Sequence, residues 1–427
     1  MTKHFFYLEG NFGIFILAKI SKLAIMKKTL LYSIIIICFL SCNNKEKYNG
    51  KWSLDIFRLD NNKIEPPSHF NIENDSIKFN YWSFNHSHKY HIKIEKNQFV
   101  FNNWTIGTNI IDDTLLLKNS FYIKDNNDSI YDWLYDKPIT KIELPKINSE
   151  HFTSNNSNNK ELKYYMLFGK RLDNNKFGLQ LNDHYAKINE IPAFLSDTRP
   201  YRSEELIPFN SSYLLIDKET PMKYLEDIFF EHKKVNQLKI CLVNNIQLKY
   251  NDSLGLYYEY ERLTKRLPPF REHDNYQSNT FDGYSSPPPP PLYYSESNDK
   301  SAIIKLILLK NNRIYFKDDI IETNQLKNLI KPWIKENNII LSLYDLESNY
   351  SSFLEMNAII DFAYQEIREE KSKTKFNKSL TDLTREELSH IKIKTPIMHI
   401  WDYSIPHFNR IIEKHNTFYG LELDLTY

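Results

Sequence analysis

The chain has 427 residues, of which 41% are hydrophobic and 26% are charged, so it can bury a substantial core. Its 55 basic and 54 acidic residues give a formal net charge of +1, without the basic surplus that nucleic-acid binding requires. The nine glycines form no G-x-x-x-x-G-K-[ST], G-x-G-x-x-G or G-x-S-x-G pattern. The sequence therefore lacks the common phosphate-binding loops and the serine nucleophile elbow.

Residues 26–42 carry the most specific pattern in the sequence. Lys27 and Lys28 precede an apolar stretch at 30–40 that is too short to cross a bilayer, and Ser41 precedes Cys42. This arrangement resembles a bacterial lipoprotein signal peptide, although Phe39 stands where that family usually has an aliphatic residue. The resemblance implies a signal peptide at 1–41, lipidation of Cys42 and a short lipidated tether at 42–47.

Two other interpretations of this segment stay open: a buried apolar element with an incidental cysteine, and a cleaved secretory signal without lipid. Residues 1–25 precede a complete signal, so we expect translation to start at Met26. A lipid on Cys42 implies a membrane-anchored protein of the cell envelope, periplasmic or surface-facing. Asn43 in place of aspartate after the cysteine favours the outer over the inner membrane by analogy with other lipoproteins.

Residues 48–147 contain short aromatic and β-branched runs separated by turns rich in Asn and Asp, which predicts an antiparallel all-β domain. The runs lie at residues 51–59, 76–83, 89–95, 98–102, 105–111, 114–117 and 121–124. With Gly50-Lys51-Trp52 at its start and the run 112–117 further on, the region resembles the lipocalin-like domains of bacterial lipoproteins. The resemblance implies a structural Trp52 and a cup-shaped barrel, either filled by side chains or holding a small apolar ligand.

Two polar or low-complexity segments divide the rest of the chain. Residues 148–160 are rich in Ser and Asn, which predicts a linker. Residues 271–300 contain five consecutive prolines at 287–291, which favour a stiff spacer over a ligand for an aromatic groove. These segments leave two further domains, at 161–270 and 301–427.

Each of these two domains contains a copy of a degenerate repeat. Residues 212–225 and 340–354 each place an apolar run before Asp-x-Glu-Thr/Ser and an amphipathic helix after it, and the aspartates lie 128 residues apart (345 minus 217). A strand–turn–strand signal precedes each copy, at 177–188 and at 303–316. Strands that alternate with helices in this order predict two-layer α+β domains.

This repeat resembles the periplasmic domain of the ExbD/TolR biopolymer-transport proteins, and residues 376–388 resemble a helical extension of some members. The resemblance implies self-association or contact with envelope proteins, in a protein accessory to an envelope transport system. The family's membrane-spanning helix, with its proton-coupling carboxylate, has no counterpart in the pattern found here. Proton-driven activity is therefore not implied.

The acids of the repeat, Asp217 and Glu219 with Asp345 and Glu347, have the composition of acid–base or metal-binding pairs, but helix capping explains them more simply. An acid near a helix N-terminus is stabilised by the helix dipole. In the first copy, Thr220 before a proline predicts an N-cap.

The second copy offers two caps: Ser352 has capping-box spacing to Glu355, and Ser348 competes with it.

Three other groups of reactive residues have simpler explanations. His86, His88 and His91 approach a metal cluster, but only the first two share a strand face, so we expect surface histidines. His273 and Asp274 lie in the proline-rich linker without a positioned serine or cysteine.

Cys241, in the strand-like run 238–243, is expected to be a small buried apolar residue rather than a reactive thiol. The sequence thus predicts a multidomain protein: a lipocalin-like all-β domain followed by two α+β domains. It also predicts a binding or scaffolding protein rather than an enzyme, with no catalytic residues, metal or cofactor. Two alternatives stay open: a carrier of a small apolar ligand in the β domain, and a hydrolase whose residues are scattered along the chain.

Overall fold

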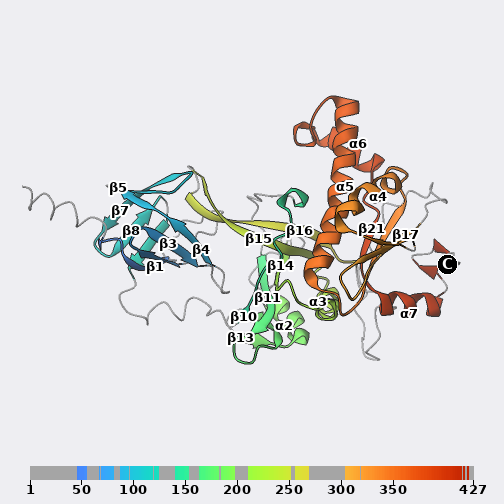
Figure 1. Ribbon diagram of the computed structural model, residues 1–427, viewed down its shortest axis with the longest axis horizontal. Helices are drawn as coiled ribbons and strands as arrows, with labels where there is room; N and C mark the ends of the chain where they lie inside the picture. Colours follow the sequence, from blue (N-terminus) through green and yellow to red (C-terminus); the bar gives the residue numbers. More distant parts are fainter. Residues whose placement is uncertain are drawn as a thin grey trace, which may run out of the picture. The chain divides into compact units, whose positions relative to one another are not determined.

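The computed structural model describes residues 46–54, 67, 69–80, 87–95, 97–118, 120–124, 140–152, 163–181, 184–197, 210–251, 255–268, 303–317, 319–415, 417–418 and 421–422. These residues fall into two compact units (Figure 1). The first unit contains 46–54, 69–79 and 88–124 of the described residues, and the second contains those from 140 onward. Cys42, the rest of the predicted signal peptide, residues 153–160 and the linker at 271–300 lie outside the described residues.

The first unit is a nine-stranded sheet with the order β4-β3-β2-β1-β9-β8-β7-β6-β5. β1 pairs antiparallel with both β2 and β9, so the first and last strands lie side by side. The two ends of the order, β4 and β5, are separated in the chain only by Ile92, whose N–H donates to the carbonyl of Asp75 at 2.9 Å. The sheet is therefore barrel-like and nearly closed, and it confirms the prediction of an antiparallel all-β fold for this unit. Its strands are β1 (Gly50–Leu54), β2 (His69–Glu73), β3 (Ser76–Asn80), β4 (Ser87–His91), β5 (Lys93–Glu95), β6 (Gln98–Val100), β7 (Thr105–Ile111), β8 (Thr114–Leu117) and β9 (Ser120–Lys124).

Aromatic rings occupy the interior of the first unit. Alternate residues of its strands are buried, for example in β2 and β8, as expected for strands with one face on a core. Trp52 is fully buried, and its indole N–H donates to the carbonyl of Tyr48 at 2.8 Å. The rings of Phe70 and Tyr122 meet at 4.8 Å, and those of Tyr48 and Phe99 at 5.1 Å. Ring packing of this kind stabilises the sheet through both area and geometry.

Truncating Trp52 should weaken this unit strongly. Trp52→Ala removes a fully buried ring and leaves a cavity, so we expect the free energy of unfolding of the first unit to fall by about 3–5 kcal/mol. The measurement is urea unfolding followed by hydrogen exchange in the peptides of β1 and β9. Trp104→Ala is the control, because Trp104 is only half-buried and should cost less. Equal losses in the two variants would contradict a central role for Trp52.

The second unit contains two sheets. One has the order β13-β12-β11-β14-β15-β16, with β10 paired to β11, and the other has the order β19-β18-β17-β20-β21. The strands of the first sheet are β10 (Thr140–Lys141), β11 (Lys163–Arg171), β12 (Phe177–Leu181), β13 (His184–Ala186), β14 (Ser211–Ile216), β15 (Lys239–Asn251) and β16 (Gly255–Arg266). Those of the second sheet are β17 (Ile303–Leu308), β18 (Ile314–Phe316), β19 (Asp319–Ile321), β20 (Ile339–Tyr344) and β21 (His399–Ser404), and a separate hairpin is formed by β22 (Thr417–Phe418) and β23 (Leu421–Glu422).

Helices accompany both sheets of the second unit. The described helices are α2 (Ile191–Asp197), α3 (Met222–Lys234), α4 (Thr323–Lys335), α5 (Tyr350–Phe376), α6 (Arg385–Lys394) and α7 (Ile405–His415), with short 3-10 turns η2 (Ser149–His151), η3 (Ile188–Glu190) and η7 (Leu380–Asp382). Among the described residues, no helix combines the length and the apolar character needed to cross a membrane.

The two sheets share one structural plan. We call the described residues of 140–268 the first half of this unit and those of 303–422 the second half. β14 pairs in parallel with β11, and β20 pairs in parallel with β17, with matching registers. The N–H of Asp217 donates to the carbonyl of Phe168, and that of Asp345 donates to the carbonyl of Leu308, both at 2.8 Å. α3 follows β14 and α5 follows β20, so positions that differ by 128 are equivalent from these strands into these helices.

The halves differ after these helices, and one core joins them. β16 belongs only to the first sheet, whereas α6 lies between α5 and β21 in the second half. Buried residues of both halves form a single apolar cluster, in which the ring of Trp401 lies 5.4 Å from that of Phe229 and 6.2 Å from that of Phe353. The start of the predicted linker also packs here, because Phe152 is buried in this cluster.

Candidate functional site

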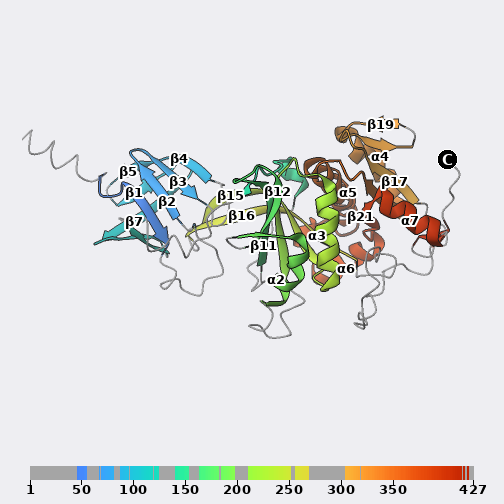
Figure 2. The ribbon, with the colours of Figure 1, turned by 90° about the horizontal axis from the view of Figure 1, so that it is seen from below.

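The two Asp-x-Glu turns of the repeat lie directly against each other. The N–H of Met222 donates to the carbonyl of Ser348 at 2.8 Å, and the N–H of Tyr350 donates to the carbonyl of Thr220 at 2.8 Å. Each donor and each acceptor is equivalent to its counterpart, 128 positions away, so the two bonds are related by an approximate two-fold axis. Figures 1 and 2 show α3 beside the first turns of α5.

The same relation holds at the neighbouring positions. Pro221 and Asn349 form an antiparallel bridge across the axis. Two further N–H groups donate across it at 2.9 and 3.1 Å, from Lys223 to Leu346 and from Ser351 to Lys218. The first N–H groups of a helix have no acceptor within their own helix. Here the turn of the opposite half supplies acceptors for the first two N–H groups of each helix.

This arrangement corrects the predicted helix caps. Pro221, not Thr220, is the N-cap residue of α3, and its side chain has no acceptor; the N–H groups of Met222 and Lys223 donate instead to carbonyls of the opposite turn. The N-cap of α5 is Asn349, whose side chain accepts from the N–H of Ser352 at 2.9 Å, so neither serine caps this helix. Asparagine is a strong N-cap residue, and its position one residue after Ser348 decides where α5 begins.

The aspartates of the repeat hold their own turns. Oδ1 of Asp217 accepts from the N–H of Glu219 at 3.0 Å, and Oδ1 of Asp345 accepts from the N–H of Glu347 at 2.8 Å. Asp217 also accepts from the N–H of Glu143 through Oδ2 at 2.9 Å. Glu347 pairs with the Lys223 ammonium at 3.0 Å, with both side chains nearly half exposed. These contacts favour the structural interpretation of the four acids.

Single Asp→Asn changes should separate the two aspartates. The side-chain amide of asparagine has one acceptor oxygen, whereas the carboxylate of aspartate has two. Asp217→Asn therefore loses a buried acceptor and should reduce the free energy of unfolding by about 1–3 kcal/mol. Asp345→Asn keeps its one bonded oxygen and should cost less than about 1 kcal/mol. Thermal unfolding of both variants is the measurement. Unchanged melting together with loss of a binding partner would instead indicate a functional role.

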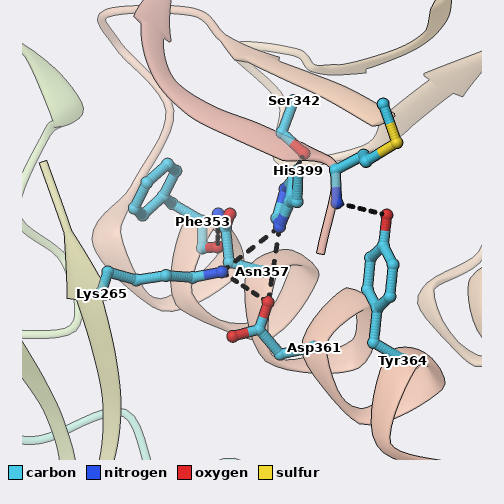
Figure 3. A network of polar contacts seen from close by, with 8 residues as sticks. Lys265, Ser342, Phe353, Asn357, Asp361, Tyr364 and His399 are labelled. Atoms are coloured by element: carbon cyan, nitrogen blue, oxygen red, sulfur yellow. Dashed lines mark hydrogen bonds and ion pairs between the residues drawn. The ribbon is translucent and has the colours of Figure 1, made fainter. Parts of the chain in front are cut away.

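A buried polar network lies further along α5 (Figure 3). The Lys265 ammonium lies 2.5 Å from Oδ1 of Asp361 and donates to Nδ1 of His399 at 3.2 Å. Nε2 of His399 lies 2.8 Å from Oγ of Ser342. Ser342 and the His399 side chain are fully buried, whereas Lys265 and Asp361 keep 7% and 16% of their side-chain surface. The four side chains come from β16, α5, β21 and β20, so both halves contribute.

Serine, histidine and aspartate in this order have the composition of a catalytic triad, but the lysine reverses the hydrogen bonding. Nδ1 of His399 lies 3.2 Å from the Lys265 ammonium, which can only donate, and 3.4 Å from Oδ1 of Asp361, a carboxylate oxygen that can only accept. The shorter contact assigns the lone pair to Nδ1 and the proton to Nε2. Nε2–H then donates to Ser342, whereas a general base would have to accept from that hydroxyl. The strand pair is irregular at this point, because a register shift between Leu341 and Leu343 places both Trp401 and Asp402 opposite Ser342.

The charges of the network are fixed by burial and by Lys265. Burial and the adjacent ammonium lower the pKa of His399 to about 4, so the ring is neutral at pH 7. Burial acts to raise the pKa of Asp361, but the adjacent Lys265 ammonium outweighs it, and the pKa of this carboxyl lies below its ordinary value. The group is therefore a buried ion pair beside a neutral histidine, and its contacts link β16, α5, β20 and β21.

A second buried ion pair joins the halves nearby. The Lys233 ammonium of α3 lies 2.8 Å from Oδ2 of Asp402 in β21, with 5% and 2% of the side chains exposed. Close to this pair, the hydroxyl of Ser404 donates to Glu226 of α3. A buried carboxylate or ammonium is tolerated only when it is paired, and each of these groups has its partner in the other half.

Among the described residues, the others singled out in the sequence do not join these networks. His91 is exposed, and His86, His273 and Asp274 lie outside the described residues. Within the described part of the chain, no three His, Cys, Asp or Glu residues are grouped so that they could hold a metal ion. Cys241 is fully buried, and its Sγ lies 3.6 Å from Oγ1 of Thr264.

Sequence reasoning missed the network around His399 and the Lys233–Asp402 pair. A signal was present, because Ser342 interrupts the apolar run 339–344 and Asp402 interrupts the aromatic run 401–403. Comparison with protein-family models gives no match, and comparison with curated proteins also gives none.

Proposed function

We propose that the protein is a lipid-anchored component of the bacterial cell envelope that binds or scaffolds other envelope proteins, as an accessory to an envelope transport system. The anchor is inferred from residues 26–42, in which a basic start and a short apolar stretch lead to Cys42. The first buried residue of the β unit is Tyr48, so the lipid would hold this unit within about 20 Å of the membrane surface.

The observation that carries the non-catalytic part of the proposal is the closure of the serine–histidine–aspartate group. Ser342 is fully buried, and Lys265 fixes the histidine as a donor toward it. A nucleophile needs both access to substrate and an accepting base. Labelling of Ser342 by a fluorophosphonate probe would contradict this interpretation and support a hydrolase.

Two resemblances and one packing observation support the rest of the proposal. The strand–turn–helix repeat and its α+β sheets favour an ExbD-like fold for both halves of the second unit. The barrel-like meander of the first unit favours a lipocalin-like domain. The aromatic rings in its interior favour a filled core over a carrier of apolar ligands, which stays the alternative.

The anchor is tested by metabolic labelling with palmitate. We expect label in the wild type, no label in Cys42→Ala, and full label in Cys38→Ala, which changes the neighbouring cysteine of the same signal. Equal label in the wild type and Cys42→Ala would exclude the lipid anchor. For the binding role, crosslinking in cells should recover envelope proteins, and recovery of none would exclude the scaffold.

A further inference from the structure

The contacts between the halves of the second unit show a consistent charge pattern. Among the described residues, three lysine–carboxylate pairs cross from one half to the other: Lys223 with Glu347, Lys233 with Asp402, and Lys265 with Asp361. In all three, the first half supplies the lysine and the second half supplies the acid. The first half also places one acid, Glu226, at this contact. Glu226 accepts a hydrogen bond from the Ser404 hydroxyl and lies 3.9 Å from Nδ1 of His407, and both of these residues belong to the second half.

The two-fold relation makes this pattern informative. Lys233 of α3 and Asp361 of α5 are 128 positions apart, and the paired turns before these helices fix them as equivalent positions. Both side chains point into the contact between the halves and are largely buried there. The same structural position therefore carries a positive charge in one half and a negative charge in the other.

Replacing one half with a copy of the other would bring like charges together in the contact. If two first halves paired in this way, Lys265 of one would face Lys233 of the other, because Lys233 occupies the place of Asp361. If two second halves paired, Asp402 would face Asp361 in place of Lys233. Each pairing of like halves would bury two like charges, which costs far more than the contact can return.

We propose that the opposite charges at these equivalent positions allow a first half to pair only with a second half. The contact surface of the first half then recognises the second half and excludes another first half. The repeat then forms its two-fold pair from one first half and one second half, and two copies of the protein do not associate through this surface by pairing like halves. Repulsion between like halves is the element that sets this specificity.

The test uses two full-length variants. The acidic chain carries Lys233→Asp and Lys265→Asp, and the basic chain carries Asp361→Lys and Asp402→Lys. The readout is the zero-length carbodiimide crosslink between Lys223 and Glu347, which are 3.0 Å apart in the paired halves. We expect the crosslink yield to fall at least tenfold in each variant and to return in the chain that carries all four substitutions.

Mixing the two variants gives the sharper result. Each half of the acidic chain fits the opposite half of the basic chain, so an equimolar mixture should form a 1:1 dimer of twice the monomer mass. With one chain isotopically labelled, the crosslinked peptides should join labelled to unlabelled chains. Lys234→Asp is the matched control, because Lys234 pairs with Glu231 within its own half and should leave the yield unchanged.

Three outcomes would overturn the proposal. The first is a wild-type crosslink yield in the acidic or basic chain alone. The second is failure of the four-substitution chain to regain the crosslink, and the third is a mixture that yields no crosslink between the two chains.

Discussion

Lowering the pH from 6.5 to 4 should destabilise the second unit by several kcal/mol. Burial lowers the pKa of His232 to about 4, and burial with the adjacent Lys265 lowers that of His399 to about 4. The ordinary value is 6.5, so within this interval the unfolded chain binds protons that the folded chain does not. Stability is therefore fully present above pH 6.5 and is lost as the pH falls toward 4, by about 1.4 kcal/mol per pH unit for each histidine.

The pKa values of His232 and His399 are lowered in different surroundings. His232 of α3 is fully buried, its Nδ1 donates to the carbonyl of Ile228 at 2.8 Å, and its Nε2 has no hydrogen-bond partner among the described residues. His399 is held by Lys265, which repels a second positive charge. Burial raises the pKa of Asp227 and Glu355, and these carboxyls offset part of the loss near the acid end of the interval.

Urea unfolding at pH 7, 6, 5 and 4.5 measures the effect. The slope of stability against pH should be about halved in His232→Gln or His399→Gln and nearly absent in the double variant. His184→Gln is the matched control, because this histidine is exposed on β13. The same slope in the wild type and the double variant would show that other groups control the acid response.

Local patterning predicted much of the fold. Five predicted runs of the first unit lie on observed strands with nearly the same bounds, for example Thr105–Ile111 and Thr114–Leu117. The amphipathic helix predicted after the second Asp-x-Glu-Ser turn is α5, whose buried residues include Phe353, Met356 and Ile360. These features depend on neighbours close in sequence. The predicted runs did not include β2, although its sequence His-Phe-Asn-Ile-Glu alternates polar and apolar residues, which is the simplest signal of a strand.

The contact between the halves could not be predicted, because its residues look ordinary in their own segments. Lys265 sits in a strand rich in charge, and only the fold brings it to Asp361, 96 positions away. In the first half, the positions equivalent to Ser342 and His399 are the core residues Leu214 and Ile240. The replacement of the apolar pair Leu214 and Ile240 by the polar pair Ser342 and His399 becomes apparent only when the two sheets are aligned by their strand register.

The helix caps also could not be predicted fully from local sequence. The Asp-x-Glu-Thr/Ser pattern correctly indicated where α3 and α5 begin, but it favoured side-chain caps that could be read from nearby serine and threonine. In the structure, the first two N–H groups of each helix donate to carbonyls of the opposite turn, and the side-chain cap of α5 is Asn349. Local sequence therefore specified the ends of these helices, while the partner that satisfies them is tertiary.

Truncating Trp401 should have the largest effect of any single change in the second unit. Its side chain is buried, and its ring contacts Phe229 of the first half and Phe353 of the second half. Trp401→Ala leaves a cavity lined by both halves, so we expect the free energy of unfolding to fall by about 3–5 kcal/mol. Trp333→Ala is the matched control, because Trp333 is only partly buried, within the second half.

The same variant tests whether the halves unfold together. Because one apolar cluster contains residues of both halves, the loss at Trp401 should appear equally in hydrogen exchange of α3 and of β21, with one unfolding step shifted to lower urea concentration. If the halves were independently stable, the exchange of β21 would accelerate while α3 kept its protection, and two steps would separate. The ring lies between Phe229 and Phe353, and the Lys265 ammonium lies 5.9 Å from its centre, so its removal also exposes the buried ion pair to water.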